Sequence, residues 1–113
     1  MAVRSISPQQ AYELQQKGVP LIDVREAPEW AEGMAAGALP VTKSNLGSNP
    51  CSHLNEFGQE VMLICAGGKR SDACADVLSE QGYTNLWSVT GGTQAWRSAE
   101  LPMQEYAVSD FDQ

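Results

Sequence analysis

The chain of 113 residues has the length of one domain, and its apolar content of 42% is enough for one modest hydrophobic core. Its 14 acidic and 7 basic side chains give a formal charge of -7, which argues against a sequence-independent nucleic-acid binder. No apolar run has the length of a membrane span or the pattern of a secretory signal. We therefore expect a single cytoplasmic domain over residues 1–113, with a core at about 5–102 and a C-terminal tail at 103–113, that binds neither nucleic acid nor a membrane.

The N-terminal part of the chain predicts a helix, a strand and a second helix. Ser7 and Gln10 have the spacing of a capping box, which predicts a helix that ends at Gly18. Residues 19–24 form an apolar, β-branched run that is typical of a buried strand. Residues 26–33 predict a short helix. The mixed composition after it predicts a loop over 34–47 with a short strand at about 39–41, and then a short helix within 48–57.

The C-terminal half repeats the alternation of strands and helices. Four elements are predicted in order: a strand over 61–64, a helix over about 71–81, a strand over 85–89 and a helix around 94–96. On the helix over 71–81, the spacing of Cys74, Val77 and Leu78 predicts a shared face toward the core. The whole pattern predicts an α/β fold with a mainly parallel central sheet flanked by helices.

The candidate catalytic residue is Cys65, which follows the predicted strand over 61–64 at the edge of the sheet where ligands usually bind. Gly67 and Gly68 allow a tight backbone curl in which successive N–H groups point inward. The start of the next helix adds partial positive charge, and Lys69 and Arg70 add full charges. A thiol in this field should ionise readily, so it needs no neighbouring histidine to become a nucleophile.

The run of residues 65–71, CAGGKRS, resembles the active-site loop of the rhodanese family of sulfurtransferases. Three further segments resemble that family in the right order: 21–25 its Asp-x-Arg strand, 29–38 its Glu-aromatic and Gly-Ala segment, and 82–96 its C-terminal signature. The resemblance covers about 5–102. It implies that Cys65 is catalytic and that the rest of the loop binds substrate: Ala66, Gly67, Gly68, Lys69, Arg70 and Ser71.

The resemblance also implies a persulfide mechanism. Cys65 would take the outer sulfur of thiosulfate or a persulfide donor and pass it to cyanide, a thiol or a protein acceptor, with no cofactor. Four residues separate Cys65 from Arg70, as in sulfur-transferring members, whereas related phosphatases have one more. The alternatives are a persulfide relay or partner-binding module and, against the loop length, a phosphatase or arsenate reductase. Arg70 is expected either to face the anion or to brace the loop, and Lys69 either to bind substrate or to point to solvent.

Other candidate residues are more readily explained by structure. Asp23 and Arg25 are tempting as an acid–base pair, but we predict structural support, with Asp23 bonded to backbone and Arg25 paired with a carboxylate such as Glu32. Cys74 is predicted to fill the core rather than to act as a resolving thiol. Cys51 has either a redox role or none. The three cysteines are expected to be free thiols, and the one histidine excludes most zinc sites.

Overall fold

The computed structural model describes residues 3–106 of the chain. The strands are β1 (Val3–Ile6), β2 (Leu21–Asp23), β3 (Met34–Ala35), β4 (Leu39–Pro40), β5 (Val61–Ile64), β6 (Leu86–Val89) and β7 (Met103–Gln104). The helices are α1 (Pro8–Gln16), α2 (Ala27–Trp30), α3 (Lys43–Ser48), α4 (Lys69–Glu80) and α5 (Gly92–Ser98), with a 3-10 turn η1 (Pro50–Ser52). None of these helices is long and apolar enough to cross a membrane.

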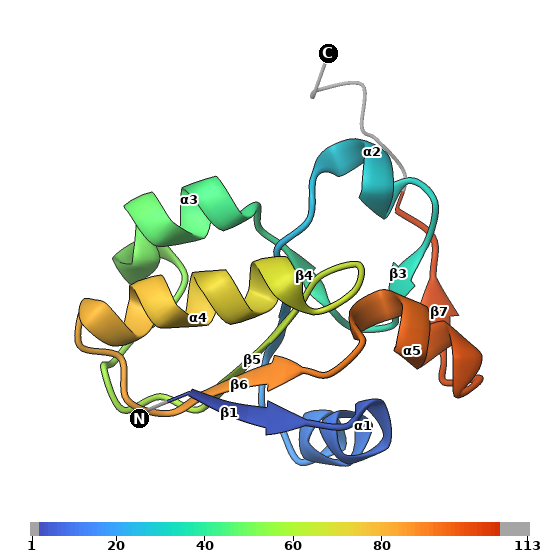
Figure 1. Ribbon diagram of the computed structural model, residues 1–113, viewed down its shortest axis with the longest axis horizontal. Helices are drawn as coiled ribbons and strands as arrows, with labels where there is room; N and C mark the ends of the chain where they lie inside the picture. Colours follow the sequence, from blue (N-terminus) through green and yellow to red (C-terminus); the bar gives the residue numbers. More distant parts are fainter. Residues whose placement is uncertain (1–2, 107–113) are drawn as a thin grey trace.

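Five strands form one parallel sheet in the order β1-β6-β5-β2-β4 (Figure 1). β3 and β7 form a separate antiparallel pair. The predicted α/β fold with a parallel central sheet is therefore confirmed. β1 was not predicted, because Val3–Ile6 is short and half polar, and within residues 3–106 it pairs only with β6, more than 80 residues later.

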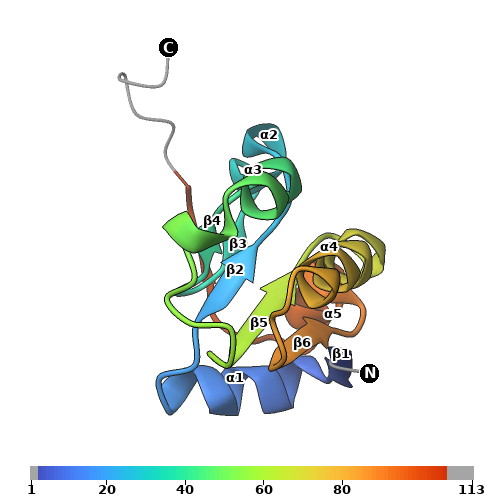
Figure 2. The ribbon, with the colours of Figure 1, turned by 90° about the vertical axis from the view of Figure 1, so that its left-hand side faces the viewer.

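The sheet divides the core into two layers, because side chains alternate along its central strands. Leu21 and Met62 lie in a cluster with residues of α1 and α5. Ile22 and Leu63 lie in a second cluster with residues of α3 and α4. Figure 2 shows α1 and α4 on opposite sides of the sheet. Both faces are covered, which explains why β5 is apolar throughout and why β2 and β6 are mostly apolar.

The predicted N-terminal helix is confirmed as α1. The Ser7 hydroxyl accepts a hydrogen bond from the backbone N–H of Gln10 at 3.2 Å, and the Gln10 side chain reaches back to the backbone N–H of Ser7. Gly18 follows the helix with φ +102°, a conformation that favours glycine. The capping signals were local, so the sequence alone sufficed to place both ends.

Within 48–57, the predicted short helix is reduced to the 3-10 turn η1 and the last residue of α3. An α-helix that was not predicted, α3, lies mostly inside the predicted loop over 34–47. Thr42 caps it by accepting a hydrogen bond from the backbone N–H of Asn45 at 3.2 Å, and Leu46 is buried against the α4 side of the sheet. Asn45 and Gly47 are poor helix formers, so burial of Leu46 rather than propensity explains the helix.

The C-terminal half has the predicted strand–helix alternation, with β5, α4, β6 and α5 in place. α4 begins at Lys69, two residues earlier than predicted. Cys74 and Leu78 are buried as expected, but Val77 is 39% exposed and does not face the core. Ser71 and Ala75 complete the buried face of α4 with Cys74 and Leu78, and Val77 lies outside this face.

The predicted tail over 103–113 falls only partly within the described residues. Its first two residues form β7, which pairs with β3 through Met34 and Ala35. Residues 107–113 lie outside the described chain. The domain boundaries given above stay a prediction.

Candidate active site

Cys65 lies at the carboxyl end of β5, where the chain turns into α4 (Figure 1). Its side chain is buried, with 1% of the residue exposed. The backbone N–H of Gly68 donates a hydrogen bond to the Cys65 Sγ at 3.0 Å. Gly68 has φ +106°, whereas Gly67 has no positive φ and is exposed. The loop therefore curls at Gly68, and this curl brings a backbone amide onto the sulfur.

Two buried hydroxyl groups support the loop from beneath. Ser71 Oγ lies 3.6 Å from Cys65 Sγ and donates a hydrogen bond to the carbonyl of Gly68 at 3.0 Å. It also lies 2.8 Å from the hydroxyl of Ser88 on β6. Ser71 was a predicted site residue, and the structure brings it to the sulfur. Ser88 was missed, although a serine inside an apolar strand was a signal that this position makes a specific hydrogen bond.

The first turn of α5 packs directly on the loop. The N–H of Thr93 donates to the carbonyl of Cys65 at 2.7 Å, and the N–H of Gln94 donates to the carbonyl of Ala66 at 3.1 Å. Gly92 makes this approach possible. A Cβ at Gly92 would lie 2.3 Å from the Cys65 carbonyl oxygen, and its φ is +59°. Only glycine fits there, so the Gly91-Gly92 pair of the sequence positions the loop.

Arg70 is held by Glu29 of α2 in a two-bonded ion pair. Its Nη1 and Nη2 lie 2.6 Å and 2.7 Å from the two carboxylate oxygens. These bonds lower the pKa of Glu29 from 4.5 to about 2 and raise the pKa of Arg70. Of the two roles expected for Arg70, the contacts fit bracing of the loop against α2. Glu29 was not singled out as its partner, and Lys69 is exposed at the start of α4.

Asp23 and Arg25 form a buried ion pair at the end of β2. The Arg25 guanidinium donates to both oxygens of Asp23, the shortest bond being 2.8 Å, and to the carbonyl of Gly33. The Arg25 backbone N–H also donates to Asp23, so the expected backbone bond is present. The expected partner Glu32 is wrong: it is exposed, while Asp23 is fully buried two residues from Arg25. Two charges buried together must neutralise each other.

Neither of the other cysteines contacts Cys65 Sγ among the hydrogen bonds of the described residues. Cys74 is buried in the core, and burial raises its pKa to about 11, which suits the predicted core role. Cys51 is exposed, with its sulfur 3.8 Å from the Tyr83 hydroxyl. Within residues 3–106, no three His, Cys, Asp or Glu side chains converge as they would around a metal ion.

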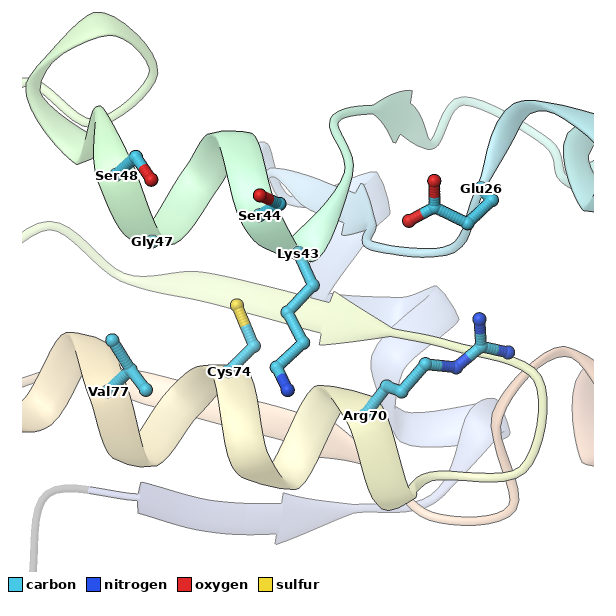
Figure 3. A pocket seen from close by; sticks show the side chains of 8 residues that line it. All are labelled: Glu26, Lys43, Ser44, Gly47, Ser48, Arg70, Cys74 and Val77. Carbon is cyan, nitrogen blue, oxygen red and sulfur yellow. The ribbon is translucent and has the colours of Figure 1, made fainter.

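A pocket of about 370 Å³ lies between α3 and α4 and reaches the catalytic loop at Arg70 (Figure 3). The sequence did not predict that the segment containing α3 forms a wall of this pocket. The lining residues come from α2's start, α3 and α4: Glu26, Lys43, Ser44, Gly47, Ser48, Arg70, Cys74 and Val77.

Comparisons with known proteins agree with this geometry. The rhodanese-like domain family matches residues 7–99. A thiosulfate sulfurtransferase, GlpE, from Haemophilus influenzae strain PittEE is 36% identical over 103 residues, which cover 91% of this chain and 96% of that protein.

Solved structures give the same result. A rhodanese-related protein from Thermoplasma volcanium is 32% identical with a TM-score of 0.77, over 91% of this chain and 99% of its own. A rhodanese-like domain from Anabaena has a TM-score of 0.80 at 19% identity, over 94% and 86%, and this shows a shared fold. The chain belongs to the rhodanese-like domain family, as the sequence motifs indicated.

Proposed function

We propose that the protein is a thiosulfate sulfurtransferase and that Cys65 is its nucleophile. The observation that carries the proposal is the hydrogen bond from the Gly68 N–H to the Cys65 sulfur inside a loop clamped by α5. An amide aimed at sulfur stabilises negative charge on it, as both a thiolate and a persulfide require. The names of the relatives, thiosulfate sulfurtransferases, support the substrate class.

The first half-reaction loads the enzyme. The Cys65 thiolate attacks the outer sulfur of thiosulfate, the S–S bond of thiosulfate breaks with its electron pair on the departing sulfite, and Cys65–S–S⁻ forms. The charges balance, since a thiolate and a dianion give a persulfide anion and a dianion. The Gly68 amide, which donates a hydrogen bond to the Cys65 sulfur, would stabilise the negative charge of the persulfide.

The second half-reaction returns the free enzyme. Cyanide or a thiolate attacks the outer persulfide sulfur, the Cys65–S bond to it breaks, and its electron pair stays on Cys65 as the thiolate. No step consumes a cofactor or a metal. We include in the proposal a protein acceptor as an alternative to a small molecule, and a cytoplasmic location, where thiols stay reduced.

The loop supports sulfur transfer over phosphate hydrolysis. Four residues lie between Cys65 and Arg70, and the Arg70 guanidinium is already occupied by Glu29. A phosphatase would need that guanidinium, or wider spacing of the amides, to surround a phosphate. The remaining loop residues, Ala66 to Ser71, then act mainly through backbone geometry, with Arg70 as a brace.

The test is thiocyanate formation from thiosulfate and cyanide by the purified protein. The wild-type protein and a Cys51→Ser control should form thiocyanate at equal rates. Cys51 is exposed, and its sulfur contacts the Tyr83 hydroxyl rather than the catalytic loop. Cys65→Ser should form none and should unfold at an unchanged denaturant concentration. If Cys65 gains a sulfur but no thiocyanate forms, the protein is a persulfide relay rather than an enzyme that turns over cyanide. Equal turnover by Cys65→Ser would refute it.

A further inference from the structure

The pocket between α3 and α4 is larger than the small substrates of the proposed reaction require. Its volume of about 370 Å³ falls in the range of roughly 300–1,000 Å³ that is typical of sites for organic ligands. Thiosulfate and cyanide contain only a few atoms each. The pocket reaches the catalytic loop at Arg70, five residues after Cys65, and the charge of a Cys65 thiolate acts on two of its lining residues, Arg70 and Cys74.

Lys43 is the pocket's cation that lies outside the two ion pairs of residues 3–106. It is half-buried at the start of α3, and Figure 3 shows its side chain extending across the pocket toward α4. Its charge acts to lower the pKa of Cys74 on α4, against the larger effect of burial. Among residues 3–106, the ion pairs are Asp23–Arg25 and Glu29–Arg70, so Lys43 has no acidic partner there. A half-buried cation without a partner favours an anionic group beside it.

The other walls of the pocket restrict what the rest of that ligand can be. Cys74, Val77 and Gly47 present apolar surface along its length. At the end next to the loop, Arg70 is neutralised by Glu29, and Glu26 adds a negative charge. A ligand with one carboxylate at Lys43, a short apolar body and an uncharged group at the loop end is complementary to this lining.

We propose that the pocket binds the sulfur acceptor, and that this acceptor is a small organic thiol bearing a carboxylate. The inference rests on the proposed function. The acceptor binds as the neutral thiol and loses its proton to solvent as it reacts, and the resulting thiolate sulfur attacks the outer sulfur of Cys65–S–S⁻. The new S–S bond makes an organic persulfide anion, and the electron pair of the broken bond remains on Cys65. Lys43 acts as a specificity residue for the acceptor.

The first test varies the charge of the acceptor and of residue 43. Three thiols share a two-carbon chain and differ in charge: 3-mercaptopropionate, 2-mercaptoethanol and 2-aminoethanethiol. For each enzyme, kcat/KM with a thiol is divided by kcat/KM with cyanide, and variant is compared with wild type so that thiol acidity cancels. Lys43→Gln should lower this ratio about fivefold for 3-mercaptopropionate and leave it unchanged for 2-mercaptoethanol. Lys43→Glu should lower it further and raise it for 2-aminoethanethiol.

Lys17→Gln is the matched control, because Lys17 is an exposed lysine at the end of α1, on the opposite face of the sheet. All three ratios should stay at their wild-type values in this variant. Equal ratios for Lys43→Gln, Lys43→Glu and wild type with every thiol would overturn the inference.

The second test fills the pocket without touching a charge. A Cβ at Gly47 would meet only Val77 Cγ1, at the ordinary contact distance of 3.8 Å, so a side chain can be added there. Gly47→Phe should raise KM for 3-mercaptopropionate about tenfold relative to KM for cyanide, while Gly47→Ala should change the two equally. If Gly47→Phe keeps the wild-type ratio, the acceptor does not bind in this pocket.

The two proposals fail in different ways. If thiosulfate and cyanide give no thiocyanate and Cys65 gains no sulfur, the proposed function fails and this inference fails with it. If thiocyanate forms but substitutions at residues 43 and 47 leave the thiol-to-cyanide ratios unchanged, the acceptor site alone is wrong and the proposed function stands. Wild-type transfer to cyanide and to none of the three thiols would also overturn the acceptor site.

Discussion

Gly92→Ala should damage both the stability of the protein and the catalytic loop. The added Cβ would lie 2.3 Å from the Cys65 carbonyl oxygen and 2.7 Å from the Ala66 carbonyl group. These are backbone atoms, so no side-chain rotation relieves the contact. Either α5 or the loop must move, and the hydrogen bond from the Thr93 N–H to Cys65 must lengthen from 2.7 Å.

The magnitude follows from these contacts. Alanine at φ +59° costs about 1–2 kcal/mol. Weakening the two hydrogen bonds from α5 to the loop costs about 1 kcal/mol each. The free energy of unfolding should therefore fall by about 3 kcal/mol, which a domain with roughly 5–15 kcal/mol of stability survives. At a urea m-value of about 1.5 kcal/mol/M, the midpoint falls by about 2 M.

The assay combines urea unfolding with the rate of persulfide formation from thiosulfate. In the folded variant, displacement of the loop should slow that rate at least about tenfold, since a shift of about 1 Å near reacting atoms can cost a hundredfold. Gly58→Ala is the control, because nothing lies within 4 Å of a Cβ at Gly58 and its φ is not positive. A Gly92→Ala protein with the wild-type midpoint and rate would show that the close approach of α5 at Gly92 does not position the loop.

Three further predictions concern the groups around the loop. Glu29→Gln should lower the unfolding free energy by about 1 kcal/mol at pH 7, since the ion pair with Arg70 is partly exposed. The folded pKa of Glu29, about 2, lies below its usual 4.5, so this difference should be complete above pH 4.5 and vanish as the pH falls toward 2; a constant difference in urea midpoints would contradict it. Cys74, with its pKa of about 11, should react with iodoacetamide in the native protein only after urea unfolds it, as mass spectrometry of the labelled peptide would reveal. Asp23→Asn should cost about 3–5 kcal/mol in urea unfolding, because it leaves Arg25 buried without its charge partner, and a cost below about 1 kcal/mol would show that the pair is not what holds this strand end.

The sequence predicted those parts of the fold whose signals are local. The capping box at Ser7 and the apolar runs of β2 and β5 specify their elements without reference to the rest of the chain. β1 and α3 were not predicted. The half-polar segment of β1 forms a strand because it pairs with β6, and α3 forms a helix because Leu46 is buried.

The candidate site divides in the same way. The position of Cys65, between a strand and a helix start, could be predicted from motif order and loop length. The partner of Arg70 could not, because Glu29 lies 41 residues away and only the folded chain brings the two together. The sequence prediction paired Arg25 with Glu32 instead of Asp23. The sequence does not show that Asp23 is buried, and a buried carboxylate needs a cation beside it.

Cys65 is proposed to carry the transferred sulfur, and the intact mass of the purified protein would reveal that sulfur. After incubation with thiosulfate and removal of excess donor, the wild-type protein should gain the mass of one sulfur atom, located on the peptide that contains Cys65. Cyanide should then remove that mass and release thiocyanate in equal amount, and Cys65→Ser should gain nothing. A sulfur found on Cys51 or Cys74, or an equal gain by Cys65→Ser, would show that Cys65 is not the sulfur carrier.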